Sequence, residues 1–420
     1  MKLKILGAGR EVGRSSFLLD FGEKILLDRG VKFHQKEIHY PMPVHTNIKA
    51  AIISHAHMDH SGDLPEFFVK SSAISFMTQA TFDLSEILWR DTIKIAKIEG
   101  TQLRYSSDEI KKTEGFTFPI SYRKKIHVSD HCSMEFFDAG HILGSAITKL
   151  WIKNKSLVYT GDFKIDETRL FKGADTRIGK TNYLIIESTY GDREHPRRRK
   201  TEKEFIESVQ GTLDNGGFAL VPAFAVGRSQ EIIDILYEYK IDAPIYYDGM
   251  GQKAAMVSLK HKELLKDPKF LAKALNSAKW VKGGNRNKII KKPCIIVTSA
   301  GMLEGGPIIW YLKHLYNDPK TKIFLTGYQV EHTNGRRLLD RKELMLDGEK
   351  VKVACQAEKY DFSAHASQGE LLELVRKLEP EFVVCVHGDP DVMDVFQEEL
   401  SALGFKSAAP KNGEELTLKE

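Results

Sequence analysis

The sequence predicts an α/β fold, and two features of its 420 residues carry that prediction. Short apolar runs of strand length recur along the chain, and each ends at a polar or small residue. Between the runs lie segments whose apolar residues return every three or four positions, which is the pattern of a helix with one buried face. Because ligands gather at the carboxyl ends of strands in layered α/β folds, the residues that follow these runs are the first candidates for a site.

The chain opens with two strand-like runs, residues 2–6 and 16–19, which lead through glycine-containing turns to the segment 23–28 and indicate a β-meander. Further strand-like runs cover residues 50–54, 157–160, 183–186, 218–221, 294–298 and 382–386, and helical patterns cover residues 202–209, 229–239 and 369–378. The charged segment 192–200 contains Pro196 and is a candidate linker into a second domain.

The composition fits a folded globular protein, because 42% of the residues are hydrophobic and charged residues are spread throughout. No apolar run approaches the ~20 residues that span a bilayer, and the first residues lack the apolar core of a signal peptide, so we expect a cytoplasmic protein without membrane contact. Four cysteines without C-x-x-C spacing argue against a disulfide framework. A net charge of +5 permits a nucleic-acid partner without demonstrating one, and residues 279–292 form the only extended basic stretch after the linker.

The strongest motif is a His-x-His-x-Asp-His array that follows the run 50–54 and consists of His55, His57, Asp59 and His60. Zinc accepts imidazole nitrogens and carboxylate oxygens, and this spacing allows His55 and His57 to hold one ion while Asp59 and His60 hold another. A solvated or buried histidine cluster is the alternative, but such density is hard to explain structurally. The array therefore predicts a metal site.

Three residues at other strand ends supply the ligands that the array still lacks. His141 lies between two glycines, Asp162 follows the run 157–160, and His387 follows the run 382–386. A carboxylate at Asp162 has two oxygens and can bridge two ions. Each of these residues alone would more often be structural, but together they complete a site for two zinc ions.

These residues resemble a known family. Asp28, the array 55–60, His141 and Asp162 resemble the successive motifs of the metallo-β-lactamase superfamily. Segments 187–192, 362–366 and 386–388 resemble the additional motifs of the β-CASP nucleases, the group of RNase J and the cleavage and polyadenylation specificity factor endonuclease. The similarity covers essentially the whole chain and starts at Met1, so we expect no amino-terminal KH domain.

The resemblance implies a metallo-β-lactamase αββα sandwich with an inserted α/β β-CASP domain. We expect residues 1–192 to form the first part of the metallo-β-lactamase domain, residues 193–350 the β-CASP domain, and residues 351–420 the returning part. The implied ligands of the first zinc ion are His55, His57 and His141, those of the second are Asp59, His60 and His387, and Asp162 would bridge the two.

The same resemblance assigns three further roles. Asp28 would hydrogen-bond the ligand loop without touching metal. His365 would be the general acid, and Glu187 would orient it or favour its protonated form. We therefore count His365, Glu187 and the metal ligand Asp59 as the catalytic set.

The resemblance implies hydrolysis of RNA phosphodiester bonds, in which a hydroxide activated by the two ions attacks in line and His365 protonates the leaving 3′ oxygen. Endonuclease and 5′-to-3′ exonuclease modes stay open, as do a homodimer and an RNA-processing complex. A DNA-processing nuclease, a small-molecule hydrolase and a non-catalytic scaffold subunit are the alternatives. The inserted segment and the His365 and His387 motifs count against the small-molecule hydrolase, and the filled ligand positions count against the scaffold.

Contacts to the substrate have weaker signals. Arg228 and Ser229 open one predicted helix, and Ser299 and Gly301 precede another, so exposed amides at both places are candidates for phosphate binding. Tight turns explain both segments equally well. Two residues depart from the family pattern: His332 stands where glycine is common, and Ser367 stands where aspartate is common.

Overall fold

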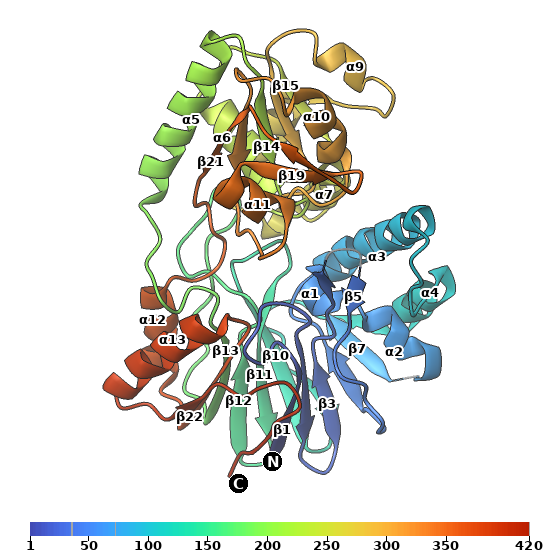
Figure 1. Cartoon of the computed structure of the whole chain (residues 1–420). Helices are drawn as coiled ribbons and strands as arrows, with labels where there is room; N and C mark the ends of the chain where they lie inside the picture. Colours follow the sequence, from blue (N-terminus) through green and yellow to red (C-terminus); the bar gives the residue numbers. More distant parts are fainter. Residues whose placement is uncertain (35–36, 72, 420) are drawn as a thin grey trace. The chain divides into compact units, whose positions relative to one another are not determined.

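A computed structural model describes residues 1–34, 37–71 and 73–419, and its chain divides into two compact units (Figure 1). Unit 1 comprises Met1–Glu194 and Ala364–Glu420, and unit 2 comprises His195–Ser363. Residues 351–363 lie within unit 2, because strand β21 (Gln356–Lys359) pairs in parallel with β18 (Lys322–Leu325) and belongs to the sheet of that unit.

Unit 1 contains two seven-stranded sheets. The first has the order β24 (Glu415–Thr417), β1 (Lys2–Gly7), β2 (Ser16–Asp20), β3 (Lys24–Leu27), β6 (Ala50–Ile52), β7 (Ile74–Met77) and β8 (Thr117–Pro119). The second has the order β23 (Ser407–Ala408), β22 (Phe382–Val386), β13 (Tyr183–Glu187), β12 (Lys155–Tyr159), β11 (Ala146–Ile152), β10 (Cys132–Asp138) and β9 (Ile126–Ser129). A short hairpin pairs β4 (Lys32–His34) with β5 (Glu37–His39).

Apolar side chains from both sheets, such as Phe17, Leu27, Phe136 and Leu150, are buried in one shared core. Helices cover the outer faces: Phe68 and Trp89 pack with residues of the first sheet, and Leu371 and Phe396 pack with residues of the second. The helices of unit 1 are α1 (Met58–Ser61), α2 (Leu64–Lys70), α3 (Gln79–Glu99), α4 (Ser107–Gly115), α12 (Gln368–Leu378) and α13 (Pro390–Ala402). These layers confirm the predicted αββα sandwich.

Unit 2 is an α/β domain with a six-stranded parallel sheet. Its order is β16 (Lys279–Trp280), β15 (Ile245–Asp248), β17 (Ile295–Thr298), β14 (Ala219–Pro222), β18 and β21, and β19 (Glu343–Leu346) pairs separately with β20 (Glu349–Lys352). Its helices are α5 (Arg198–Asp214), α6 (Arg228–Glu238), α7 (Gly251–Lys260), α8 (Pro268–Ser277), α9 (Arg286–Ile289), α10 (Pro307–Leu315) and α11 (Asn334–Arg341), with a 3₁₀ turn at Lys262–Leu264. This confirms the inserted α/β domain.

In unit 1 the candidate site residues lie at the ends of strands, as predicted. The array 55–60 follows β6, Asp162 follows β12, Glu187 is the last residue of β13, and His387 follows β22. The 21-residue helix α3 was not predicted from the sequence. It begins after Thr78, whose side chain accepts a hydrogen bond from the Thr81 amide.

Among the described helices, none combines the length and the apolar character that a membrane span requires.

Candidate active site

The metal array sits on a turn that a single buried carboxylate holds in place. After β6 the chain turns through residues 53–57 into the short helix α1. Asp28 Oδ1 accepts a hydrogen bond from the Ser54 amide at 2.7 Å, and Asp28 Oδ2 accepts from Ser54 Oγ at 2.7 Å and from the Tyr159 hydroxyl at 2.5 Å. Asp28 therefore lies where its predicted loop-holding role requires.

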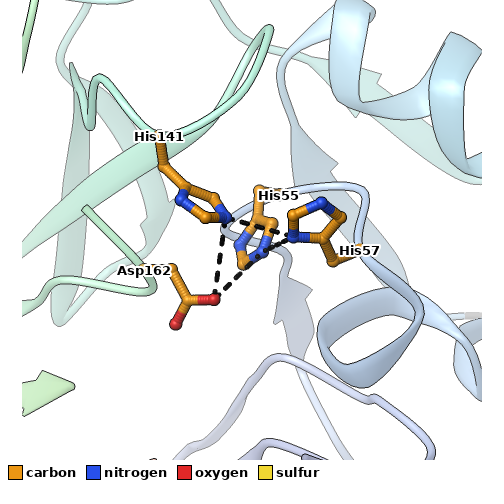
Figure 2. Close-up of side chains that lie close together, drawn as sticks. All are labelled: His55, His57, His141 and Asp162. Carbon is orange, nitrogen blue, oxygen red and sulfur yellow. Dashed lines mark hydrogen bonds and ion pairs between the residues drawn. The ribbon is translucent and has the colours of Figure 1, made fainter. Parts of the chain in front are cut away.

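The first group of donor atoms consists of His55, His57, His141 and Asp162 (Figure 2). His57 Nδ1 lies 3.2 Å from His55 Nε2 and 3.1 Å from His141 Nε2. Nitrogens that bind one tetrahedral zinc ion at ~2.0–2.1 Å lie ~3.3 Å apart. The spacing of these three nitrogens, which come from two separate loops, fits one zinc ion.

The hydrogen bonds behind this group present lone pairs toward its centre. The Ala364 carbonyl can only accept, so His141 Nδ1 donates to it at 2.8 Å and His141 Nε2 keeps its lone pair. Ser54 Oγ already donates to Asp28, so it accepts at 3.0 Å from His55 Nδ1. Burial lowers the pKa of His55 and His141 well below the usual value, and it lowers the pKa of His57 to about 4. All three imidazoles are thus held in the neutral form that zinc binds.

The second group of donor atoms consists of Asp59, His60 and His387. His387 Nε2 lies 3.2 Å from Asp59 Oδ2. His60 Nδ1 lies 2.7 Å from Asp28 Oδ2 and donates to it, which leaves Nε2 to face the site. Burial opposes protonation of His60, but Asp162 and Asp28 raise its pKa well above the usual value. Metal binding at this group therefore has to displace a proton.

Asp162 contacts both groups. Its Oδ2 lies 3.5 Å from His55 Nε2 and 3.3 Å from His60 Nε2, and its Oδ1 lies 3.2 Å from His387 Nδ1. Burial raises the pKa of Asp162, but the neighbouring imidazoles, His387 foremost, lower it well below the usual value. An ionised carboxylate shared by two donor groups is the arrangement expected of a bridging ligand.

Beside the donor groups lies a histidine–carboxylate pair. His365 Nδ1 is 2.9 Å from Glu187 Oε2, and the His365 ring centroid is 4.7 Å from that of His141. Glu187 is itself held, because it accepts hydrogen bonds from the Phe163 amide and the Thr189 hydroxyl at 2.8 and 2.7 Å. Burial lowers the pKa of His365, but Glu187 and Asp162 outweigh it and raise the pKa to about 9.

Close packing of β13 against β22 brings His387 to the site. The two strands run parallel, and Glu187 lies opposite Val386. The next residues have little room, because a Cβ on Gly388 would lie 2.7 Å from the Ser188 carbonyl oxygen. The Val-His-Gly segment therefore needs its glycine so that the loop can approach this closely.

Sequence analysis missed the residues that hold the His365 loop. Glu370 accepts hydrogen bonds from Lys164 Nζ and from the amides of Ile165 and Ser367, so it ties the loop after Asp162 to the start of α12. The spacing of Ser367 and Glu370 is that of a capping box, a signal that was readable in the sequence. Ser367, which departs from the family pattern, donates to Glu194 at 2.7 Å.

The proposed substrate contacts lie at the carboxyl ends of β14 and β17 in unit 2. Two of them are already engaged: Arg228 is buried and pairs with Glu231, and Ser229 Oγ lies 2.8 Å from the Tyr247 hydroxyl. The Arg228 and Ser229 amides also donate to Val226 and Phe224 carbonyls. These contacts favour the tight-turn interpretation for this pair. Phosphate contact at Ser299 and Gly301 stays a prediction.

His332, the other residue that differs from the family pattern, has a backbone φ of 68°. This left-handed conformation favours glycine and is uncommon for other residues. The conformation explains why glycine suits this position, and histidine occupies it here with some backbone strain.

Comparisons with known proteins agree with this geometry. Three family models match: the Beta-Casp domain over residues 229–338, the Zn-dependent metallo-hydrolase RNA specificity domain over residues 350–410, and Anti-Pycsar protein Apyc1 over residues 1–182. A solved protein of unknown function from Enterococcus faecalis shares the fold with a TM-score of 0.60 at 13% identity, over 99% of both chains.

Several archaeal relatives are similar over nearly the whole chain. The protein named Probable RNase MJ4 of Methanocaldococcus jannaschii is 40% identical, with 100% of both chains covered. RNase aCSPSF2 of Saccharolobus solfataricus is 37% identical over 99% of this chain and 85% of its own. Transcription termination factor FttA of Methanocaldococcus jannaschii is 34% identical over 93% of this chain and 67% of its own. The chain therefore belongs to the β-CASP group of metallo-β-lactamase ribonucleases and is a hydrolytic nuclease.

Proposed function

We propose that this protein is a zinc-dependent ribonuclease that hydrolyses RNA phosphodiester bonds in RNA processing or decay. The observation that carries the proposal is the pair of donor groups that share Asp162, next to the His365–Glu187 pair. The RNA-specificity family model and the relatives named as RNases support RNA as the substrate.

The donor set supports two zinc ions. His55, His57 and His141 would hold one ion, Asp59, His60 and His387 the other, and Asp162 would contact both. Neutral imidazoles with a few carboxylates are typical zinc ligands, whereas magnesium and calcium prefer sites made of oxygen atoms. When bound, the ions would act as Lewis acids that polarise a phosphodiester and lower the pKa of water between them.

The protein itself supplies the proton for the leaving group. His365 Nδ1 faces Glu187, so a proton for the substrate would come from the other ring nitrogen, Nε2. Because its pKa is about 9, His365 carries both protons at neutral pH and is ready to act as an acid. Protonation of the ribose 3′ oxygen would leave a 3′-hydroxyl and a 5′-phosphate.

A cleavage assay on matched substrates tests the proposal and separates its variants. Zinc-loaded protein is incubated with 5′-labelled RNA and with DNA of the same sequence, each with a 5′-monophosphate or a blocked 5′ end. Internal fragments from blocked RNA indicate an endonuclease, and release only from monophosphorylated ends indicates a 5′-to-3′ exonuclease. Cleavage of DNA alone would replace the RNA substrate by DNA, and no cleavage of either polymer would contradict the proposal.

We also expect a homodimer or an RNA-processing complex, and a cytoplasmic location. A sedimentation measurement on the purified protein addresses the first of them, with a single monomeric species as the contrary result.

A further inference from the structure

Positive charge is concentrated in one stretch of unit 2. Residues 268–303 contain eight lysines and arginines and no aspartate or glutamate. The formal net charge of the whole chain is +5, so the remaining residues are together net negative. This asymmetry is unlike a solvated face of mixed sign, which is the usual context of surface lysines.

Six of these eight charges lie on the terminal strand of the sheet or in the segment that follows it. Strand β16 is the terminal strand of the six-stranded sheet, and the chain continues from it through α9 to β17. We call residues 279–292 the basic edge; its exposed lysines are Lys279, Lys282, Lys288, Lys291 and Lys292. Among the residues that the structure describes, no acidic side chain forms a salt bridge with any of these five.

The basic edge is a fixed part of the domain. Arg286, at the start of α9, donates to the buried Asp248 through Nε at 2.7 Å and through a terminal nitrogen at 3.1 Å. Tyr311 of α10 donates to the same carboxylate at 2.9 Å. Gln252 of α7 donates to the Val281 carbonyl at 3.1 Å. Arg286 and Gln252 therefore join the basic edge to β15 and α7, and Tyr311 of α10 holds the carboxylate that Arg286 contacts.

Aromatic side chains lie among the lysines. Trp280 is 38% exposed, although its indole nitrogen is held by the Leu275 carbonyl at 3.0 Å and its ring packs edge-on against Tyr247. Lys279 Nζ lies 5.6 Å from the centre of the Tyr246 ring. An exposed, immobilised aromatic ring beside unpaired lysines is the combination that single-stranded nucleic acids use, with phosphates on the lysines and a base on the ring.

We propose that the basic edge of unit 2 is an RNA-binding surface that holds the backbone of a single-stranded stretch of long substrates. The inference rests on the proposed ribonuclease function and adds a second contact region to it. It predicts that long RNAs bind more tightly than short ones and that the difference depends on salt.

A competing explanation is that lysines protect an exposed strand edge from pairing with other chains. That explanation accounts for Lys279 on β16. It does not account for the lysines beyond the strand, around α9, or for the exposed Trp280. The two explanations differ in whether RNA binding changes when the charges are removed.

The test compares two variants of equal charge. In the first, Lys279, Lys282, Lys288, Lys291 and Lys292 are changed to Gln; in the control, five other exposed lysines of unit 2, Lys203, Lys240, Lys320, Lys342 and Lys352, are changed to Gln. Binding is measured with an oligouridylate of about 40 nucleotides, well beyond the ~4–16 nucleotides that one platform covers. Cleavage of a fragment of about six nucleotides reports on the metal centre.

The proposal predicts that the first variant binds the long RNA at least about tenfold more weakly, with a salt dependence reduced by up to ~3 in log–log slope, since each phosphate contact on a single strand contributes ~0.7. Cleavage of the short fragment should not change, and the control variant should stay within about twofold of the unmodified protein. Equal binding by the two variants would overturn the proposal.

A measurement on the unmodified protein covers the case in which the first variant aggregates. Photo-crosslinking to 4-thiouridine in the long RNA should label peptides that contain Trp280 and the segment 279–292. Labelling confined to other peptides would overturn the proposal. If the unmodified protein neither binds nor cleaves any RNA, the ribonuclease function itself fails, and that result is distinct from both outcomes.

Discussion

Both units place polar residues just after strands, but these residues form different contacts in the two units. In unit 1 the side chains of His55, His141 and Asp162 turn their donor atoms toward one another and keep lone pairs for a ligand. In unit 2 the Arg228 side chain forms an ion pair with Glu231, and the Ser229 hydroxyl forms a hydrogen bond with the Tyr247 hydroxyl. A strand-end position therefore marks where a site can form, and the hydrogen bonds behind each side chain decide whether it does.

The largest expected effect is at the carboxylate shared by both donor groups. Asp162→Ala removes an oxygen ligand from each group, so metal content should fall below two per chain and turnover should drop on the order of a thousandfold or more. Metal analysis of the purified variant and single-turnover cleavage measure the two changes. Retention of two tightly bound ions would mean that Asp162 is not a shared ligand.

Substitution of His365, the proposed acid, should lower kcat without changing the metal content. In His365→Ala no group remains to protonate the leaving oxygen, so kcat should fall about 10²- to 10⁴-fold. His365 lies outside both ligand sets, so metal content should stay that of the unmodified protein. A collapse of metal content in this variant would make His365 a ligand instead.

Substitution of Asp28, which holds the ligand loop, should lower the affinity for zinc more than it lowers the activity of the zinc-loaded protein. Asp28→Ala frees the Ser54 turn and removes the acceptor of His60 Nδ1, so zinc affinity should fall about 10- to 100-fold. Competition with a chelator measures this change, and excess zinc should restore most of the activity. Tyr159→Phe removes one of the same hydrogen bonds and serves as a milder control. Unchanged zinc affinity in Asp28→Ala would contradict the assignment.

A smaller effect is expected at the partner of the acid. Glu187→Gln removes the largest of the charges that together raise the pKa of His365 to about 9. The acid form is lost as pH rises through that pKa, so a lower pKa should move the alkaline limb of the kcat profile to lower pH. The measured quantity is the position of this limb. An unmoved limb would show that Glu187 does not tune the acid.

The smallest effect on chemistry is expected in unit 2. Arg228→Gln breaks a buried ion pair, so we expect a loss of stability on the order of a few kcal/mol and a change in KM for short RNA of no more than about twofold. Thermal unfolding and steady-state kinetics measure these two quantities. A large rise in KM without a loss of stability would restore Arg228 as a phosphate contact.

The donor residues could be predicted because local signals mark them: the array has its own spacing, His141 lies between glycines, and Asp162 and His387 follow strand-length apolar runs. It could not find the groups that set their protonation. Ala364 contributes only a backbone carbonyl, and Tyr159 occupies an ordinary core position of β12. Their roles arise from contacts between residues more than a hundred positions apart, and a local pattern contains no trace of them.

The proposed mechanism requires that two donor groups sharing Asp162 hold two zinc ions. Crystals of the zinc-loaded protein, measured by anomalous scattering at the zinc edge, would show the ions themselves. We expect two peaks, one among His55, His57 and His141 and one among Asp59, His60 and His387, both in contact with Asp162. A single peak, or two peaks on other ligands, would contradict it.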